Sequence, residues 1–189
     1  MRYAAAALLL ATACNGGSTA PGTSADPLPM IATDACPAPA DLLAPAEEPK
    51  DGRRLPDATL PCLGHDGEVR MRALGKTPTV VNLWGSWCHP CRTEMPEFQK
   101  VHVALEGKVR FLGVDTKDFE RAARVAIQNA AISYASVFDK DEKVRRALNA
   151  RSLPATVLVG ADGRIKDVHV GALTAAELRA LIAEHLGVA

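Results

Sequence analysis

The sequence has no excess of charge of either sign. Lys and Arg number 22, and Asp and Glu also number 22, so the formal net charge of the 189 residues at pH 7 is zero. A nucleic-acid partner needs a basic face, and we expect none here. The sequence also has no apolar run of about 18 residues, the length that a membrane-spanning helix requires. We therefore expect one domain with additional segments and no helix that remains as a membrane span.

Cysteine is scarce, and its spacing narrows the possible chemistry. The chain has five cysteines, which are Cys14, Cys36, Cys62, Cys88 and Cys91. Only the last two form a Cys-x-x-Cys pair, whereas structural zinc takes four ligands, usually from two such pairs. A redox role for Cys88 and Cys91 is favoured over metal binding or a permanent disulfide. Cys36 and Cys62 would pair in an oxidising compartment; the alternative is two free thiols.

The first residues resemble an export signal. Arg2 supplies one positive charge, a short apolar stretch follows, and small residues precede Cys14. A cut before a cysteine resembles a bacterial lipoprotein signal, which predicts a signal peptide over residues 1–13 and a lipid on Cys14. The sequence departs from the lipoprotein signal pattern at Ala11, three places before the cysteine, where that pattern usually has Leu, Val or Ile. The alternative is an ordinary cleaved signal with Cys14 incidental, and a soluble periplasmic or secreted protein.

Residues 14–54 are predicted to form the lipidation site and a tether. Gly16 to Ala40 is rich in Gly, Ser, Thr, Ala and Pro and has neither a helical nor a strand period. Such a composition predicts a flexible linker. About 20 residues of this kind have an end-to-end distance of roughly 25 Å, which would let a domain over residues 55–189 reach partners near the membrane.

From residue 79 onward, strand and helix patterns alternate. Apolar runs rich in β-forming residues predict strands over residues 79–84, 109–114, 134–138, 156–159 and 164–170. Helical spacing of apolar residues, or a capping pattern, predicts helices over residues 91–105, 118–127 and 141–148 and a last helix that begins at residue 174. Asp162-Gly163 indicates a hairpin between the last two strands. Parallel strands joined by crossover helices are covered on both faces. The fold class is therefore α/β, a three-layer α/β/α sandwich with a mixed central sheet.

The chemistry centres on the run from Trp84 to Cys91, which reads Trp-Gly-Ser-Trp-Cys-His-Pro-Cys. It follows a predicted buried strand and opens a predicted helix. In the reduced form Cys88 would face the helix N-terminus, whose unpaired N–H groups and positive dipole end favour the thiolate. Cys88 would attack a partner disulfide, and Cys91 would resolve the mixed disulfide. The reverse steps would donate a disulfide, and neither direction needs a bound cofactor.

This run, followed by Arg-Thr-Glu-Met-Pro over residues 92–96, resembles the thioredoxin superfamily. More narrowly, it is similar to the TlpA/ResA-type extracytoplasmic branch, and the resemblance covers roughly residues 55–187. It implies a thioredoxin-like fold in which Cys88 is the exposed nucleophile and Cys91 the buried resolving thiol. It also implies that Pro154 is a cis-proline facing the cysteines and that the Leu153 backbone pairs with substrate. The alternative is a trans-proline that opens the strand.

Two positions depart from cytosolic thioredoxins. Asn82 stands where many of them carry a buried Asp, and it cannot take a proton. Glu94 is the nearest ionisable substitute, and the resemblance implies that it assists proton transfer to the cysteines. Partial burial would raise its pKa toward neutrality; the alternative is a surface glutamate. His89 stands where thioredoxin has Gly, and as a cation it would stabilise the Cys88 thiolate and make the disulfide more oxidising.

The remaining expectations concern partners and rival functions. Trp87 is expected to shield the disulfide, and His89 and Pro90 to join it in lining or tuning the substrate groove. The expected partners are exported proteins with thiols or disulfides and a membrane electron donor or acceptor. The branch resemblance implies a reductant, for example of cytochrome c precursors, whereas His89 favours an oxidant. The alternatives are a Cu(I)- or Zn(II)-binding module and a thiol peroxidase, although the Pro-x-x-x-Thr-x-x-Cys pattern is absent around Cys88.

Overall fold

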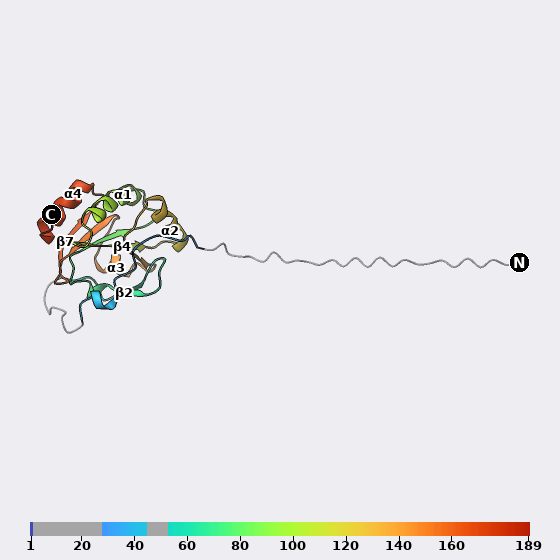
Figure 1. Cartoon of the computed structure of the whole chain (residues 1–189), viewed down its shortest axis with the longest axis horizontal. Coiled ribbons are helices and arrows are strands. Elements are labelled where there is room, and N and C mark those ends of the chain that lie inside the picture. Colours follow the sequence, from blue (N-terminus) through green and yellow to red (C-terminus); the bar gives the residue numbers. More distant parts are fainter. Residues whose placement is uncertain (2–27, 45–52) are drawn as a thin grey trace.

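A computed structural model describes residues 1, 28–44 and 53–189 of the chain, and a five-stranded sheet forms its centre (Figure 1). In spatial order, the strands are β5 (Ser136–Asp139), β4 (Arg110–Thr116), β3 (Thr79–Trp84), β6 (Ala155–Val159) and β7 (Ile165–Val170). β3, β4 and β5 run parallel, while β6 and β7 pair antiparallel. The sheet is therefore mixed, and the predicted thioredoxin-like fold class is confirmed.

The helices α1 (His89–Ala104), α2 (Glu120–Asn129) and α4 (Ala175–Leu186) cover one face of this sheet (Figure 1). α1 and α2 lie on the same face because both crossovers are right-handed and the chain advances in one direction, from β3 to β4 to β5. The short helix α3 (Lys143–Ala147) contributes Val144 to the core on the opposite face. The central strand β3 is buried over all six residues, as a strand covered on both faces should be.

Two short strands that the sequence did not predict complete the second face. β1 (Thr59–Pro61) pairs antiparallel with β2 (Glu68–Arg70), and Leu60 lies opposite Val69. Both side chains are buried in the core beneath β3 and β4. Three-residue strands have too few positions to show an alternating pattern, which is why this small sheet has no clear signal in the sequence.

For residues 28–44 the structure differs from the expected flexible tether. This segment lies against the domain, with Ile31 and Leu42 buried in the two cores. The Asp34 N–H donates to the Ser133 carbonyl at 2.6 Å, and Cys36 forms a disulfide with Cys62. A few apolar anchors and one covalent link hold a segment whose overall composition is that of a linker. The predicted signal peptide, Cys14 and the rest of the tether lie outside the described residues.

The described part of the chain contains no helix that is both long and apolar enough to span a bilayer. Its longest helix, α1, has 16 residues and carries charged side chains along its exposed face.

Candidate active site

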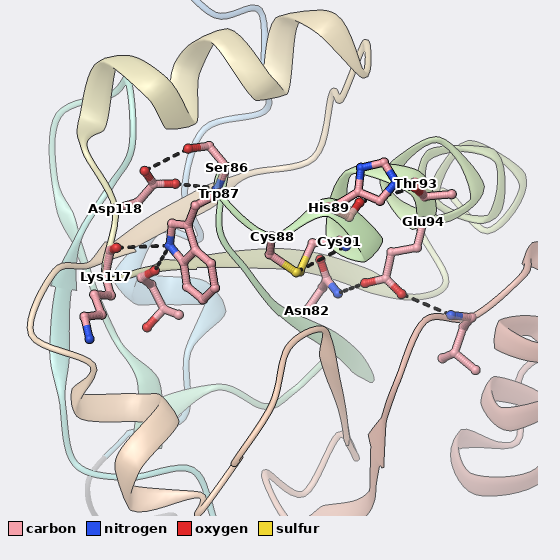
Figure 2. The surroundings of a disulfide bond; sticks show 12 residues. Asn82, Ser86, Trp87, Cys88, His89, Cys91, Thr93, Glu94, Lys117 and Asp118 are labelled. Atoms are coloured by element: carbon pink, nitrogen blue, oxygen red, sulfur yellow. Dashed lines mark hydrogen bonds between the residues drawn. A yellow bond between two sulfur atoms is a disulfide. The ribbon is translucent and has the colours of Figure 1, made fainter.

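The disulfide Cys88–Cys91 lies where β3 gives way to α1 (Figure 2). Cys88 is the N-cap of α1, and its Sγ accepts a hydrogen bond from the Cys91 N–H at 3.3 Å. Pro90 is in the first turn, where its missing N–H leaves no helical hydrogen bond unmade. After reduction, the Cys88 sulfur would therefore receive a backbone N–H and the positive end of the helix dipole, both of which favour the thiolate.

The two cysteines are less different in exposure than the resemblance implied. Cys88 is only 5% exposed and Cys91 is fully buried, because both belong to the core between α1 and the sheet. The expectation of an exposed nucleophile is therefore wrong for the disulfide form. Cys88 is still the one of the pair that reaches solvent, so an incoming partner would meet Cys88 first.

Glu94 lies one turn after Cys91 on the same side of α1 and is 2% exposed. Its Oε1 accepts from Asn82 Nδ2 at 2.8 Å, and its Oε2 accepts from the Leu173 N–H at 3.1 Å (Figure 2). Burial raises the pKa of the Glu94 carboxyl from 4.5 to about 7, although both hydrogen bonds oppose the rise. The alternative of a surface glutamate is wrong. At neutral pH this buried carboxyl can either hold or accept a proton beside the cysteines.

Asn82 gives the Glu94 carboxyl a partner in both of its protonation states. The Asn82 Oδ1 is buried, and no group in the described part of the chain forms a hydrogen bond with it. An ionised Glu94 needs donors and takes the Asn82 NH₂, whereas a protonated Glu94 needs an acceptor, and a rotated Asn82 amide would present Oδ1. The same rotation would accommodate a glutamine at position 94.

Replacement Glu94→Gln is expected to change how stability depends on pH. The folded-state pKa of about 7 exceeds the ordinary value of 4.5, so the folded protein binds more protons than the unfolded chain between these values. Its free energy of unfolding should fall as pH rises through this window, by about 3 kcal/mol in all. The Glu94→Gln variant should lack this loss. Urea unfolding of both oxidised proteins at several pH values from 4.5 to 8 measures it, and parallel curves would contradict the burial of an ionising Glu94.

The loop before Cys88 is held by the segment that follows β4. The Asp118 carboxylate accepts from the Ser86 N–H, from the Ser86 Oγ–H at 2.8 Å and from the Phe119 N–H at 2.7 Å. Trp87 is 53% exposed, and its Nε1 donates to the Lys117 carbonyl at 3.0 Å (Figure 2). Asp118 was expected to open a helix, but α2 begins at Glu120. Asp118 instead orients the active-site loop.

Asp115 is a buried acid at this end of β4 that the sequence analysis did not single out. It is fully buried, and neither carboxyl oxygen has a hydrogen-bond partner among the described residues. Burial first, then the neighbouring carboxyls of Asp118 and Asp139, raise the pKa of Asp115 to about 9. Asp115 is therefore neutral at pH 7 and adds no second negative charge beside Asp118. The only sequence signal was an acid at the end of an apolar strand.

The Leu153–Pro154 peptide bond is cis, the form that the resemblance implied. Ala155, the next residue, lies opposite Leu83 in the antiparallel pairing of β6 with β3. This register brings the proline to the end of the sheet from which the Cys88 loop departs. Pro154 is buried and Leu153 is partly exposed. The proposed pairing of the Leu153 backbone with substrate stays a prediction.

His89 and Pro90 are exposed in the first turn of α1. The His89 carbonyl accepts a hydrogen bond from the Thr93 side-chain hydroxyl, Oγ1, at 3.2 Å, one helical turn further along. Within the described ranges, no three His, Cys, Asp or Glu side chains are arranged to hold a metal ion. The sulfurs of Cys88 and Cys91 are instead bonded to each other.

The part of the chain that forms this site matches a known protein family. The profile of the AhpC/TSA family matches residues 52–168, a range that contains the disulfide, Glu94 and Pro154. The chain belongs to the AhpC/TSA family. Among relatives, the thiol-disulfide oxidoreductase ResA of Halalkalibacterium halodurans is 32% identical over 111 residues, which cover 58% of this chain and 63% of ResA.

One further relative of this AhpC/TSA protein agrees with that result, and a solved structure shares its fold. The thiol:disulfide interchange protein DsbE of Xylella fastidiosa strain 9a5c is 32% identical over 133 residues, covering 69% of this chain and 66% of DsbE. The crystal structure of a secreted Mycobacterium tuberculosis disulfide oxidoreductase has the same fold, with a TM-score of 0.61 and 24% identity over 68% of this chain and 96% of that one. The Cys88–Cys91 disulfide and the ResA and DsbE relatives identify a thiol–disulfide oxidoreductase.

Proposed function

We propose that this protein works outside the cytoplasm, where it exchanges the Cys88–Cys91 disulfide with thiols or disulfides of exported proteins. The observation that carries the proposal is the pair of sulfurs at the N-cap and first turn of α1, of which only Cys88 reaches solvent. A structural disulfide would not need a helix N-terminus that stabilises the thiolate formed on its reduction.

The proposed reaction runs in two steps. The reduced Cys88 thiolate attacks a disulfide sulfur of the partner, forming a mixed disulfide and releasing one partner thiolate. Cys91 then loses its proton and attacks the Cys88 sulfur, which releases the second partner thiolate and leaves Cys88–Cys91 oxidised. Glu94 is the proposed acceptor of the Cys91 proton, because it lies one turn away on the same side of α1 and its pKa is about 7. Two electrons pass from this protein to its partner.

The same steps in reverse would oxidise a partner dithiol, so the direction depends on reduction potentials. The resemblance to the TlpA/ResA-type branch favours the reductant, with exported cytochrome c precursors as one substrate class and a membrane protein as electron donor. Equilibration of the pair with glutathione buffers measures the potential. A value near that of thioredoxin, about −270 mV, would support the reductant, and a value about 100 mV or more higher would support an oxidant.

Three observations support an extracytoplasmic location. The Cys36–Cys62 disulfide is of the kind that persists in oxidising compartments. One neighbour in structure is described as secreted. The first residues of the sequence resemble a lipoprotein signal ending at Cys14. We propose that a lipid on Cys14 holds the protein at a bacterial membrane, and mass spectrometry of the membrane fraction would test this.

The Cys91→Ser variant tests the proposed exchange with proteins. Cys88 should still attack a partner, but no second thiol would release it, so mixed disulfides should accumulate in cells that produce the variant. Non-reducing electrophoresis would show these adducts, reductant should dissolve them, and their mass spectra would identify the partners. The Cys88→Ser/Cys91→Ser variant is the matched control and should trap nothing. Equal adducts in both variants would contradict the proposal.

A further inference from the structure

A groove of about 450 Å³ lies beside the active site, between the start of α1 and α2. Residues that line it include Ser86, Arg92, Phe119, Arg121, Ala122 and Val125. Two of its lining residues are sequence neighbours of the redox cysteines. Ser86 is two residues before Cys88, and Arg92 directly follows Cys91. A partner whose sulfur reaches Cys88 therefore places part of its chain at or near this groove.

The groove exposes apolar side chains that a partner could cover. Phe119 is 83% exposed and Val125 is 40% exposed, and both face the groove together with Ala122. The Phe119 backbone is fixed, because its N–H donates to the Asp118 carboxylate that also binds Ser86. One carboxylate thus sets the position of this exposed ring relative to the active-site loop. Clustered exposed apolar side chains of this kind mark interaction sites.

The charged groups that line the groove are cationic. Arg92 and Arg121 are both exposed and line its walls. A carboxylate that enters the groove would meet these guanidinium groups, which bind carboxylates with paired hydrogen bonds.

We infer that this groove binds the segment of the partner polypeptide next to the attacked cysteine, and that it selects a segment with an apolar side chain and a neighbouring acidic one. The inference rests on the proposed exchange with proteins and adds a specificity determinant to it. The apolar side chain would pack on Phe119 and Val125, and the carboxylate would pair with Arg92 or Arg121. The cis-proline directly precedes β6, which pairs with β3 on the side away from β4, so the two sites would hold different parts of the partner.

Three synthetic peptides test the groove. Each carries the same internal Cys-x-x-Cys disulfide, and they differ only in the flanking residues: Leu-Glu, Leu-Lys or Gly-Ser. The reduced protein should reduce the Leu-Glu peptide about tenfold faster than the Leu-Lys peptide, since charge complementarity acts mainly on the association rate. Arg121→Glu should reverse this order, and Phe119→Ser should bring the Leu-Glu peptide close to the Gly-Ser peptide. Should Phe119→Ser fail to fold, Val125→Ser replaces it.

The controls separate this inference from the proposed function. Arg179→Glu makes the same charge change on α4, which packs on the other side of α1 from α2, and it should leave the peptide order unchanged. Reaction with bis(2-hydroxyethyl) disulfide, which is uncharged and much smaller than the groove, should be similar in all variants. Equal peptide rates, or the same effect from Arg179→Glu, would overturn the groove alone. No reaction with any peptide or with bis(2-hydroxyethyl) disulfide would overturn the proposed function itself.

Discussion

Replacement of Cys88 by serine is expected to reduce the rate of protein-disulfide exchange to that of the uncatalysed reaction. A serine hydroxyl does not ionise near neutral pH and cannot form the mixed disulfide, so the first step has no nucleophile. Cys91 cannot replace Cys88, because it is fully buried behind it. The measurement is the rate at which dithiothreitol reduces insulin with and without each protein.

The Cys91→Ser variant gives the contrasting result. Its Cys88 should still react with iodoacetamide at neutral pH and form a mixed disulfide, but turnover should stop after the first step. The two variants differ by one sulfur each at neighbouring positions of the same helix start, so a general effect on folding would not separate them. If Cys88→Ser kept turnover, or if Cys91→Ser were inert to alkylation, the assignment of Cys88 as the nucleophile would be wrong.

Removal of the second disulfide is expected to lower stability without removing activity. Cys36 and Cys62 close a loop with a sequence separation of 26. The chain-entropy relation gives about 3.5 kcal/mol as the stabilisation from such a loop. For a protein of this size that corresponds to a fall in Tm of about 7–14 °C. The Cys36→Ala/Cys62→Ala variant tests this by thermal unfolding monitored by circular dichroism.

Activity should survive this change because the two disulfides lie apart in the fold. The backbone of Cys62 forms an isolated antiparallel β-bridge with Val137 of β5. Cys36 Sγ lies 3.9 Å from the carbonyl oxygen of Ser136, at the start of β5. Cys62 belongs to the core on one face of the sheet, whereas Cys88 and Cys91 belong to the core on the other face. Each single variant leaves one free thiol and serves as a control. A double variant that unfolds at the wild-type temperature would show that residues 28–44 add no stability through this bond.

The redox pair was readable from sequence because everything that defines it is local. Cys88 and Cys91 are three positions apart, and the spacing of the apolar residues that follow them predicts the helix that they open. The strand over residues 79–84 and the hairpin at Asp162-Gly163 were also predicted correctly, since a short run or a dipeptide specifies each. The capping box of Thr174 with Glu177 is a third local signal that the structure contains.

The surroundings of the pair depend on residues that are distant along the chain. The hydrogen bond from the Leu173 N–H to Glu94 joins positions 79 apart, and those from Ser86 to Asp118 join positions 32 apart. The composition of residues 28–44 indicated a linker, and only the positions that Ile31 and Leu42 reach in space show that the segment packs on the domain.

By itself, the sequence determined the two reactive sulfurs, their place at a helix start and the order of strands and helices around them. These properties depend on backbone preferences and side-chain periodicity within a few residues. Only the tertiary structure decided that Glu94 is buried with a pKa of about 7, that Asp118 holds the active-site loop and that a cationic groove lies beside Cys88. Burial and charge depend on which segments meet in space, and local sequence patterns do not contain that information.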